Sequence, residues 1–139
     1  MDRKIIPVPK NLVESLEQGL SLPSGNSERF SGYGVMGLTF ASGHVLGLRR
    51  FPASSVGPGY TSVWYRNLEG RWTFYQDVQP QQACPRYFGS AISEALVREI
   101  TVEWTGTHSF AVTIGDDINL RWQVSLKATT ATRLMNTIY

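Results

Sequence analysis

The feature that most constrains the fold of this chain is a strict alternation of apolar and polar residues over residues 118–129. Successive side chains of a β-strand point to opposite faces of the sheet, so this period of two predicts a strand with one buried face. The same alternation occurs at 97–105 and at 110–114, with glycine-containing turns between the segments. The C-terminal part of the chain is therefore expected to form three antiparallel strands joined by tight turns. The buried face of the last strand would carry Ile118, Leu120, Trp122, Val124, Leu126 and Ala128.

Three earlier segments, at 43–51, 60–67 and 71–78, also have the composition of strands. Their alternation is less clean, because aromatic residues occur on both expected faces. With a strand beginning near residue 31 and another at 86–92, the chain is expected to hold eight strands, with no long helix between them. Strands with two apolar faces would line a cavity or form an interface, so we expect the functional surface in this first half of the sheet.

The fold class indicated by this pattern is all-β. Consecutive antiparallel strands leave unpaired edges unless the sheet closes, and about eight strands close around a small ligand or a filled core. We therefore expect an antiparallel, up-and-down β-barrel, with a Greek-key sandwich as the alternative, since a strand pattern does not fix topology. Glycines would allow the sharp bending that closure requires; they stand at positions 32, 34, 37, 43 and 47.

The first 29 residues differ from the rest and are expected to form an N-terminal arm with a short helix. Asn11 followed by Glu14 is typical of a helix cap, and Leu12, Leu16 and Leu20 would share one face. Such a short helix is not stable alone, so it should pack its leucines over one mouth of the barrel. The domain organisation expected is an arm at 1–29 and a single β-barrel domain at 30–139.

Composition excludes several classes of function. The chain has 139 residues and a net charge of +2, and its basic residues are dispersed, so no stripe of positive charge predicts a nucleic-acid partner. A single cysteine, Cys84, and the lack of an apolar leader favour a cytoplasmic location. No segment has the composition of a membrane span. Two histidines and one cysteine are too few for an ordinary zinc site, so no metal is expected.

A glycine pattern at residues 32–37 matches the dinucleotide fingerprint G-x-G-x-x-G. That fingerprint acts only between a strand and a helix, with an acidic residue about 20 positions later. Here the following residues are strand-like, and residues 49–61 contain no acid. We therefore interpret the glycines as a curved strand and expect no cofactor.

Several short motifs combine aromatic and glycine positions: 64–66 (Trp-Tyr-Arg), 70–74, 84–89, 104–106, 120–122 and 131–136. Together they resemble uncharacterised bacterial lipocalin-like proteins and the N-terminal half of the two-barrel hydroxyneurosporene synthase and AttH-like group. The resemblance spans about residues 30–136. It implies a lipocalin-like (calycin) β-barrel, and in the broader group some members hydrate, isomerise or cyclise apolar substrates.

The candidate ligand-binding residues come from the strands with two apolar faces. Mostly apolar walls with a few polar anchors are typical of small-molecule cavities, and an inward arginine favours a carboxylate or an enolate. The expected walls are Trp64, Tyr65, Trp72, Phe74 and Tyr75, and the expected polar anchors are Arg49, Arg50, Arg66, Asp77, Arg86 and Tyr87.

Three functions stay open at this point. The first is binding of a small, largely apolar or aromatic ligand in a barrel cavity. The second is an isomerase, cyclase or lyase acting on an apolar substrate, for which Tyr87, Asp77 and His44 could supply an acid or a base. The third is a protein-interaction domain, in particular a homodimer that covers the apolar strands.

Overall fold

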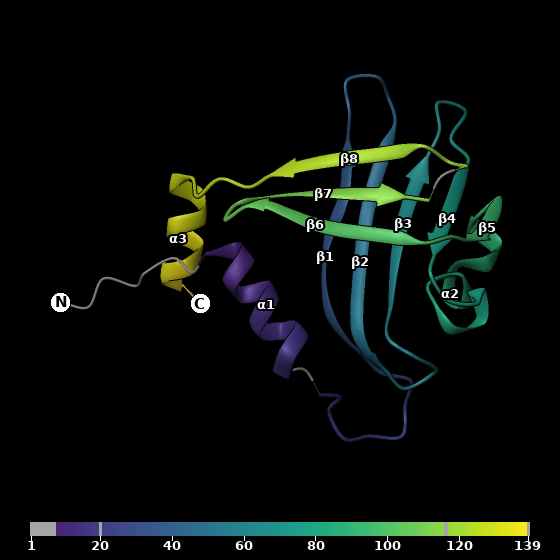
Figure 1. Ribbon diagram of the computed structural model, residues 1–139, viewed down its shortest axis with the longest axis horizontal. Helices are drawn as coiled ribbons and strands as arrows, with labels where there is room; N and C mark the ends of the chain where they lie inside the picture. Colours follow the sequence, from purple (N-terminus) through teal and green to yellow (C-terminus); the bar gives the residue numbers. More distant parts are fainter. Residues whose placement is uncertain (1–7, 20, 116, 139) are drawn as a thin grey trace.

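The fold consists of two β-sheets, as seen in a computed structural model that describes residues 8–19, 21–115 and 117–138 (Figure 1). The described residues contain eight strands, the number expected from the sequence. The larger sheet comprises β1 (Phe30–Thr39), β2 (Val45–Ser54), β3 (Tyr60–Arg66), β4 (Trp72–Gln76) and β5 (Glu94–Val97). The smaller sheet comprises β6 (Ile100–Gly106), β7 (Ser109–Ile114) and β8 (Leu120–Ser125).

Consecutive strands are neighbours in both sheets, and all pairs are antiparallel except β4 and β5, which are parallel. The prediction was an all-β antiparallel fold, and the structure confirms its coarser form: a mostly β chain with mostly antiparallel sheets. Among the described strands, no pairing joins β1–β5 to β6–β8, so a closed barrel is not seen. The sequential strand order in the described sheets also differs from the Greek-key alternative.

The expected strand at 86–92 is wrong. A parallel connection from β4 to β5 needs a crossover, and residues 80–91 supply it. They form a 3₁₀ turn at Pro80–Gln82, the one-turn helix α2 (Pro85–Phe88) and a second 3₁₀ turn at Gly89–Ala91. Pro85 at the start of α2 favours the helix, because its fixed φ suits a first turn and it has no N–H to donate to a strand.

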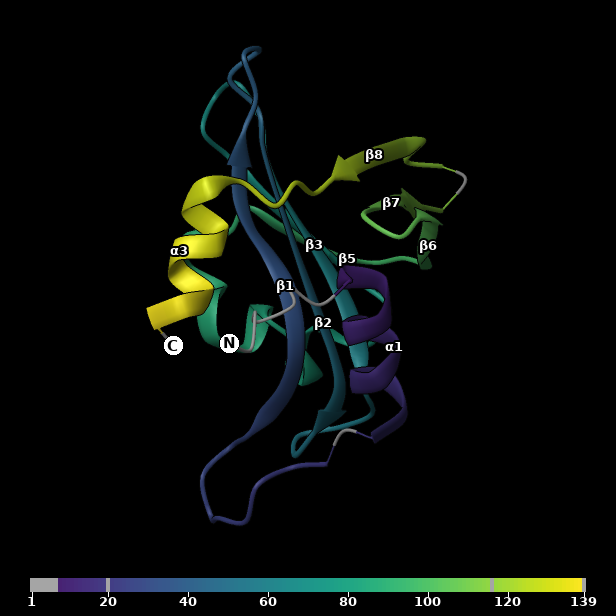
Figure 2. The same cartoon turned by 90° about the vertical axis from the view of Figure 1, so that its left-hand side faces the viewer.

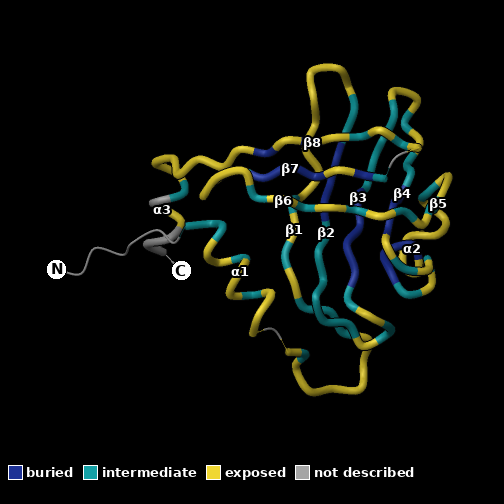
Figure 3. The backbone as a smooth tube through the Cα atoms, viewed as in Figure 1, coloured by how far each residue is buried: buried dark blue, intermediate teal, exposed yellow. Residues whose placement is uncertain are grey.

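The main core lies between the two sheets, whose strands cross at a steep angle (Figure 1). Leu48, Val63 and Tyr75 from the larger sheet pack against Val112 and Trp122 from the smaller one. Figure 3 shows buried residues on β2, β3 and β7 where the sheets cross. We call the face of the larger sheet that meets this core its inner face.

The outer face of the larger sheet carries a second apolar cluster. Tyr60 and Phe74 are buried there against Ala83 and Cys84 from the crossover segment. Both faces of β3 and β4 are therefore covered, one by the smaller sheet and one by the segment around α2. This double coverage explains the aromatic residues on both faces of these strands.

Two longer helices flank the sheets. The expected N-terminal helix is α1 (Pro9–Gly19), and a helix not expected from the sequence, α3 (Thr130–Ile138), follows β8. Figure 2 shows α1 on the same side of the larger sheet as β6–β8, and α3 on the other side. Of the leucines expected to dock this helix, Leu12 is exposed, Leu16 is half-buried, and Leu20 lies outside the described residues. Of the helices described, none is long and apolar enough to span a membrane.

Candidate functional site

The residues expected to bind a ligand divide between the two faces of the larger sheet. Arg49, Trp64 and Phe74 point to the outer face, whereas their chain neighbours Arg50, Tyr65 and Tyr75 point to the inner face. This division follows from the period of two along each strand. The expected site is therefore two separate surfaces, and the outer one holds more of the expected residues.

A cavity of about 400 Å³ opens on the outer face, between strands β1–β3 and helix α2. We call it the aromatic pocket. Aromatic rings form its walls. The rings of Phe30 and Tyr87 pack edge to face with centroids 5.6 Å apart, and those of Phe51 and Tyr60 pack edge to face with centroids 5.5 Å apart. Its lining consists of Phe30, Arg49, Phe51, Tyr60, Trp64, Cys84, Tyr87 and Phe88.

A smaller hollow of about 180 Å³ adjoins the aromatic pocket and shares Trp64 and Phe88 with it. Trp72, Phe74 and Ile92 line this hollow. The indole of Trp64 lies parallel to the ring of Phe74, with centroids 4.6 Å apart and planes 5° apart. Five expected site residues thus lie in one connected apolar region: Arg49, Trp64, Trp72, Phe74 and Tyr87.

Arg49 is the cation of the aromatic pocket. Its guanidinium lies 4.5 Å from the centroid of the Trp64 ring, which is a cation–π contact. Nη1 donates to the carbonyl oxygens of Val35 and Leu48, both at 2.8 Å, and Nη2 has a weak acceptor, the sulfur of Met36, at 3.4 Å. Among the residues that the structure describes, no carboxylate lies within ion-pair distance of Arg49.

Polar side chains extend from Arg49 across the sheet. Arg49 is the register partner of Ser62, and Ser62 is the partner of Gln76, so the three share the outer face in one cross-strand row. Ser62 and Gln76 have no exposed surface. The Ser62 hydroxyl and both amide atoms of Gln76 find no hydrogen-bond partner within the described part of the chain. Buried polar atoms are normally paired, so these groups stand out, but neither Ser62 nor Gln76 is among the residues that line the aromatic pocket.

Helix α2 is held against the sheet by Glu28, which precedes β1. The Glu28 carboxylate accepts hydrogen bonds from the Arg86 guanidinium, with Nη2 2.5 Å from Oε1, and from the Tyr87 hydroxyl. These two hydrogen bonds, from Arg86 first, lower the pKa of Glu28 to about 2. Arg86 therefore acts as a tether, and Tyr87 is fixed at the rim of the aromatic pocket.

Tyr60 and Cys84 form the floor of the aromatic pocket. The Tyr60 hydroxyl lies 3.4 Å from Cys84 Sγ, and both residues are buried. Burial, and then the contact with Cys84, raises the pKa of Tyr60, so the phenol stays protonated. This pair can donate or accept a hydrogen bond within an otherwise apolar floor.

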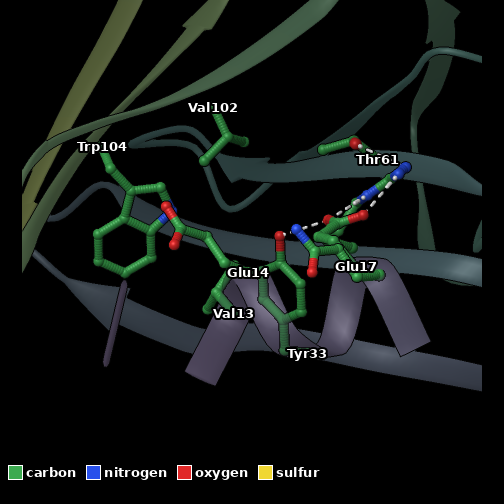
Figure 4. A pocket seen from close by; sticks show the side chains of 9 residues that line it. Val13, Glu14, Glu17, Tyr33, Thr61, Val102 and Trp104 are labelled. Carbon is green, nitrogen blue, oxygen red and sulfur yellow. Dashed lines mark hydrogen bonds and ion pairs between the residues drawn. The ribbon is translucent and has the colours of Figure 1, made fainter. Parts of the chain in front are cut away.

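The inner face carries a second cavity, of about 330 Å³, beneath α1 (Figure 4). Arg50 reaches it and pairs with Glu17 through two hydrogen bonds, Nε–Oε1 at 2.9 Å and Nη2–Oε2 at 3.2 Å. Tyr33 donates to the same carboxylate at 2.7 Å. The hydrogen bond from Arg50 is the main cause that lowers the pKa of Glu17. No sequence pattern singles out Glu17, Tyr33 or Trp104 as site residues, because folding alone brings them together.

The remaining expected residues lie elsewhere. Tyr75 is buried in the inter-sheet core, and Tyr65 packs against that core and stacks on His44 with ring centroids 5.7 Å apart. Asp77 accepts a hydrogen bond from the Thr61 backbone N–H at 2.8 Å. Arg66 lies at the end of β3, against Gly70. The three side chains considered for acid–base chemistry, Tyr87, Asp77 and His44, are thus not brought into one cluster.

Metal-ligating side chains do not gather in the part of the chain that is described, where no group of three His, Cys, Asp or Glu could hold an ion. No protein-family model, curated protein or solved structure matches this chain. The lipocalin-like resemblance stays a prediction, and the two cavities are the features of the structure that bear on function.

Proposed function

We propose that this protein binds a small aromatic carboxylate in the aromatic pocket. The observation that carries the proposal is the position of Arg49, a partly buried cation that lies against aromatic rings with no acid partner among the described residues. A guanidinium in an apolar, partly desolvated place is a strong site for a carboxylate, because charge-assisted hydrogen bonds strengthen as water is excluded.

The surroundings of Arg49 support a preformed anchor. The two carbonyl oxygens that accept from Nη1 hold one edge of the guanidinium, while Nη2 has only a sulfur acceptor. A ligand carboxylate would replace that weak acceptor without reorienting the side chain, which limits the entropy lost on binding. The ligand ring would then contact Trp64 and Phe51, where aromatic pairs add attraction beyond burial of area.

The direct test compares naphthoate with the uncharged naphthylmethanol by isothermal titration calorimetry, using the wild-type protein and R49Q. Loss of charge-assisted hydrogen bonds should weaken naphthoate binding roughly tenfold to hundredfold in R49Q, and should change naphthylmethanol binding less than about threefold. R121Q is the matched control, because Arg121 is exposed on β8 in the other sheet and carries the same charge. Equal effects of R49Q on the two ligands would contradict the carboxylate assignment.

The other sequence interpretations rank lower. An isomerase, cyclase or lyase needs an acid or base at the substrate. Of the three expected candidates, Asp77 and His44 lie outside the aromatic pocket, and Tyr87 lines it but donates its hydroxyl proton to Glu28. A homodimer draws support from the edge strand β1, where Met36 and Leu38 are exposed. Sedimentation velocity tests it: a monomer at every concentration would contradict pairing. A lipocalin-like barrel and a cytoplasmic location remain expectations from the sequence.

A further inference from the structure

Two neighbouring hollows lie beneath α1 and share four lining residues. The outer hollow, of about 330 Å³, is the cavity of Figure 4, and the inner one, of about 160 Å³, lies between the sheets. Both are lined by Val13, Tyr33, Val102 and Trp104. The outer hollow is polar on one side, whereas Val35, Leu48 and Phe110 make the inner one apolar. The combined shape suits a slender molecule with one polar end.

The charges around the outer hollow favour a cation. Its lining includes the acids Glu14 and Glu17 and the single base Arg50, which gives a formal charge of −1 from two negative groups and one positive group. Arg50 is already neutralised by its two hydrogen bonds to Glu17. Among the described residues, the ion-pair partner of Glu14 is Lys10, at 3.8 Å on the exposed helix surface, and such a pair contributes little. The carboxylate of Glu14 is thus free to accept a stronger partner.

Trp104 supplies the second part of a cation site. Glu14 and Trp104 both line the outer hollow, and in Figure 4 the Glu14 side chain extends toward the indole. A cation held over an indole face is attracted by the negative charge of the ring face, and a nearby carboxylate adds direct Coulomb attraction. Below Trp104 the lining becomes apolar, toward Phe110 and Leu126.

We propose that this space is a second binding site, specific for an amphipathic organic cation such as a primary alkylammonium. The ammonium group lies between Glu14 and Trp104, and the alkyl chain enters the inner hollow between the sheets. Helix α1 covers the site. Glu17 of this helix accepts hydrogen bonds from Arg50 and Tyr33, and the backbone N–H of Lys10 donates to the carbonyl oxygen of Thr107 at 3.2 Å. This site is independent of the aromatic pocket, because Arg50 and Arg49 face opposite sides of β2.

The test is a titration of isotope-labelled protein with n-octylammonium, followed by NMR. The amides of α1 and the indole N–H of Trp104 should shift together, and one dissociation constant should fit both. E14Q should weaken binding about tenfold, because it removes the charge that pairs with the ammonium. E103Q is the matched control: Glu103 is exposed on β6, next to Trp104 but on the alternate face. It should leave the affinity unchanged.

Two further ligands separate the alternatives. Octanoate should bind this site at least tenfold more weakly than octylammonium, and octanol should fall between them. Octanoate binding more tightly would overturn the charge assignment, and equal binding of all three would reduce the site to an unspecific apolar hollow. Shifts confined to residues outside α1 and β6 would overturn the location. Because Glu14 is exposed, E14Q should keep the wild-type melting temperature, and R49Q should bind octylammonium normally.

Discussion

Arg49 and Arg50 are adjacent in the sequence and have opposite surroundings in the fold. Arg50 is paired with Glu17 on the inner face, whereas Arg49 lies over Trp64 on the outer face with only backbone oxygens and a sulfur as acceptors. The sequence predicted both as ligand anchors. It could not separate them, because the pairing of Arg50 depends on an acid 33 positions away in the chain.

Gly34 is a second residue whose role follows from its position beside Arg49. It is the register partner of Arg49. A Cβ on Gly34 would overlap the Leu48 carbonyl oxygen and lie 3.1 Å from Cδ of Arg49. The sequence suggested glycines for strand bending, and the structure adds that Gly34 leaves room for the arginine side chain.

We expect Gly34→Ala to destabilise the protein by about 2 kcal/mol, because overpacking against backbone atoms forces the strands apart. Urea denaturation measures this change. Gly89→Ala is the matched control, since a Cβ there meets nothing within 4 Å and the backbone is helical; it should change the stability by less than about 0.5 kcal/mol. Equal stability of the two variants would contradict the close packing at Gly34.

Among the elements, the crossover segment around α2 determines the shape of the aromatic pocket. Phe88 packs on Trp64, with ring centroids 5.2 Å apart, and Tyr87 packs on Phe30. A helix of one turn has little stability of its own, so α2 depends on these contacts and on Glu28. The sequence predicted a strand here because aromatic and β-branched residues such as Tyr87, Phe88 and Ile92 are also typical of strands.

We expect Glu28→Gln to loosen α2 while leaving the sheets intact. Hydrogen exchange should speed up at Arg86 and Tyr87, whose amides bond to the Ala83 and Cys84 carbonyls, and remain slow at Val112. Glu14→Gln, which removes an exposed carboxylate on the surface of α1, is the control. Unchanged exchange in α2 would contradict the tether.

The same tether predicts a dependence on pH. Folding lowers the pKa of Glu28 from 4.5 to about 2, because Arg86 and Tyr87 donate to its charged form. A carboxyl group with a lowered pKa stabilises the fold fully above its unfolded value, and the effect is lost as the pH falls through the folded value. The stabilisation from Glu28 should therefore be complete above pH 4.5 and vanish as the pH approaches 2. In E28Q, exchange at α2 should be insensitive to pH over this range after correction for intrinsic rates.

For the whole molecule, the sequence predicted best the strands that have one solvent face. The alternation at 97–105, 110–114 and 118–129 corresponds to β6, β7 and β8, whose apolar side chains do face the core. The alternation ends earlier in the structure than in the pattern, since β8 stops at Ser125. A strand with one buried face must alternate apolar and polar residues. This alternation can therefore be recognised in the sequence without knowledge of the tertiary structure.

The larger sheet was harder to predict for the same physical reason. Its outer face is covered by α2 and its inner face by the smaller sheet, so aromatic residues occur on both and the pattern no longer identifies the core. The aromatic pocket is lined mostly by residues of the first half of the chain, and the expectation that this half carries the functional surface stays a prediction. The division into two faces, the crossover and the contacts of α1 arise from long-range packing, which no local pattern encodes.

The most direct test of the central claim is a map of intermolecular nuclear Overhauser effects between naphthoate and isotope-labelled protein. Binding in the aromatic pocket predicts contacts from the naphthalene protons to Phe51, Trp64 and Tyr87, all on the outer side of the larger sheet. Contacts to Val13 and Trp104 beneath α1, or no contacts at saturating ligand, would contradict the claim.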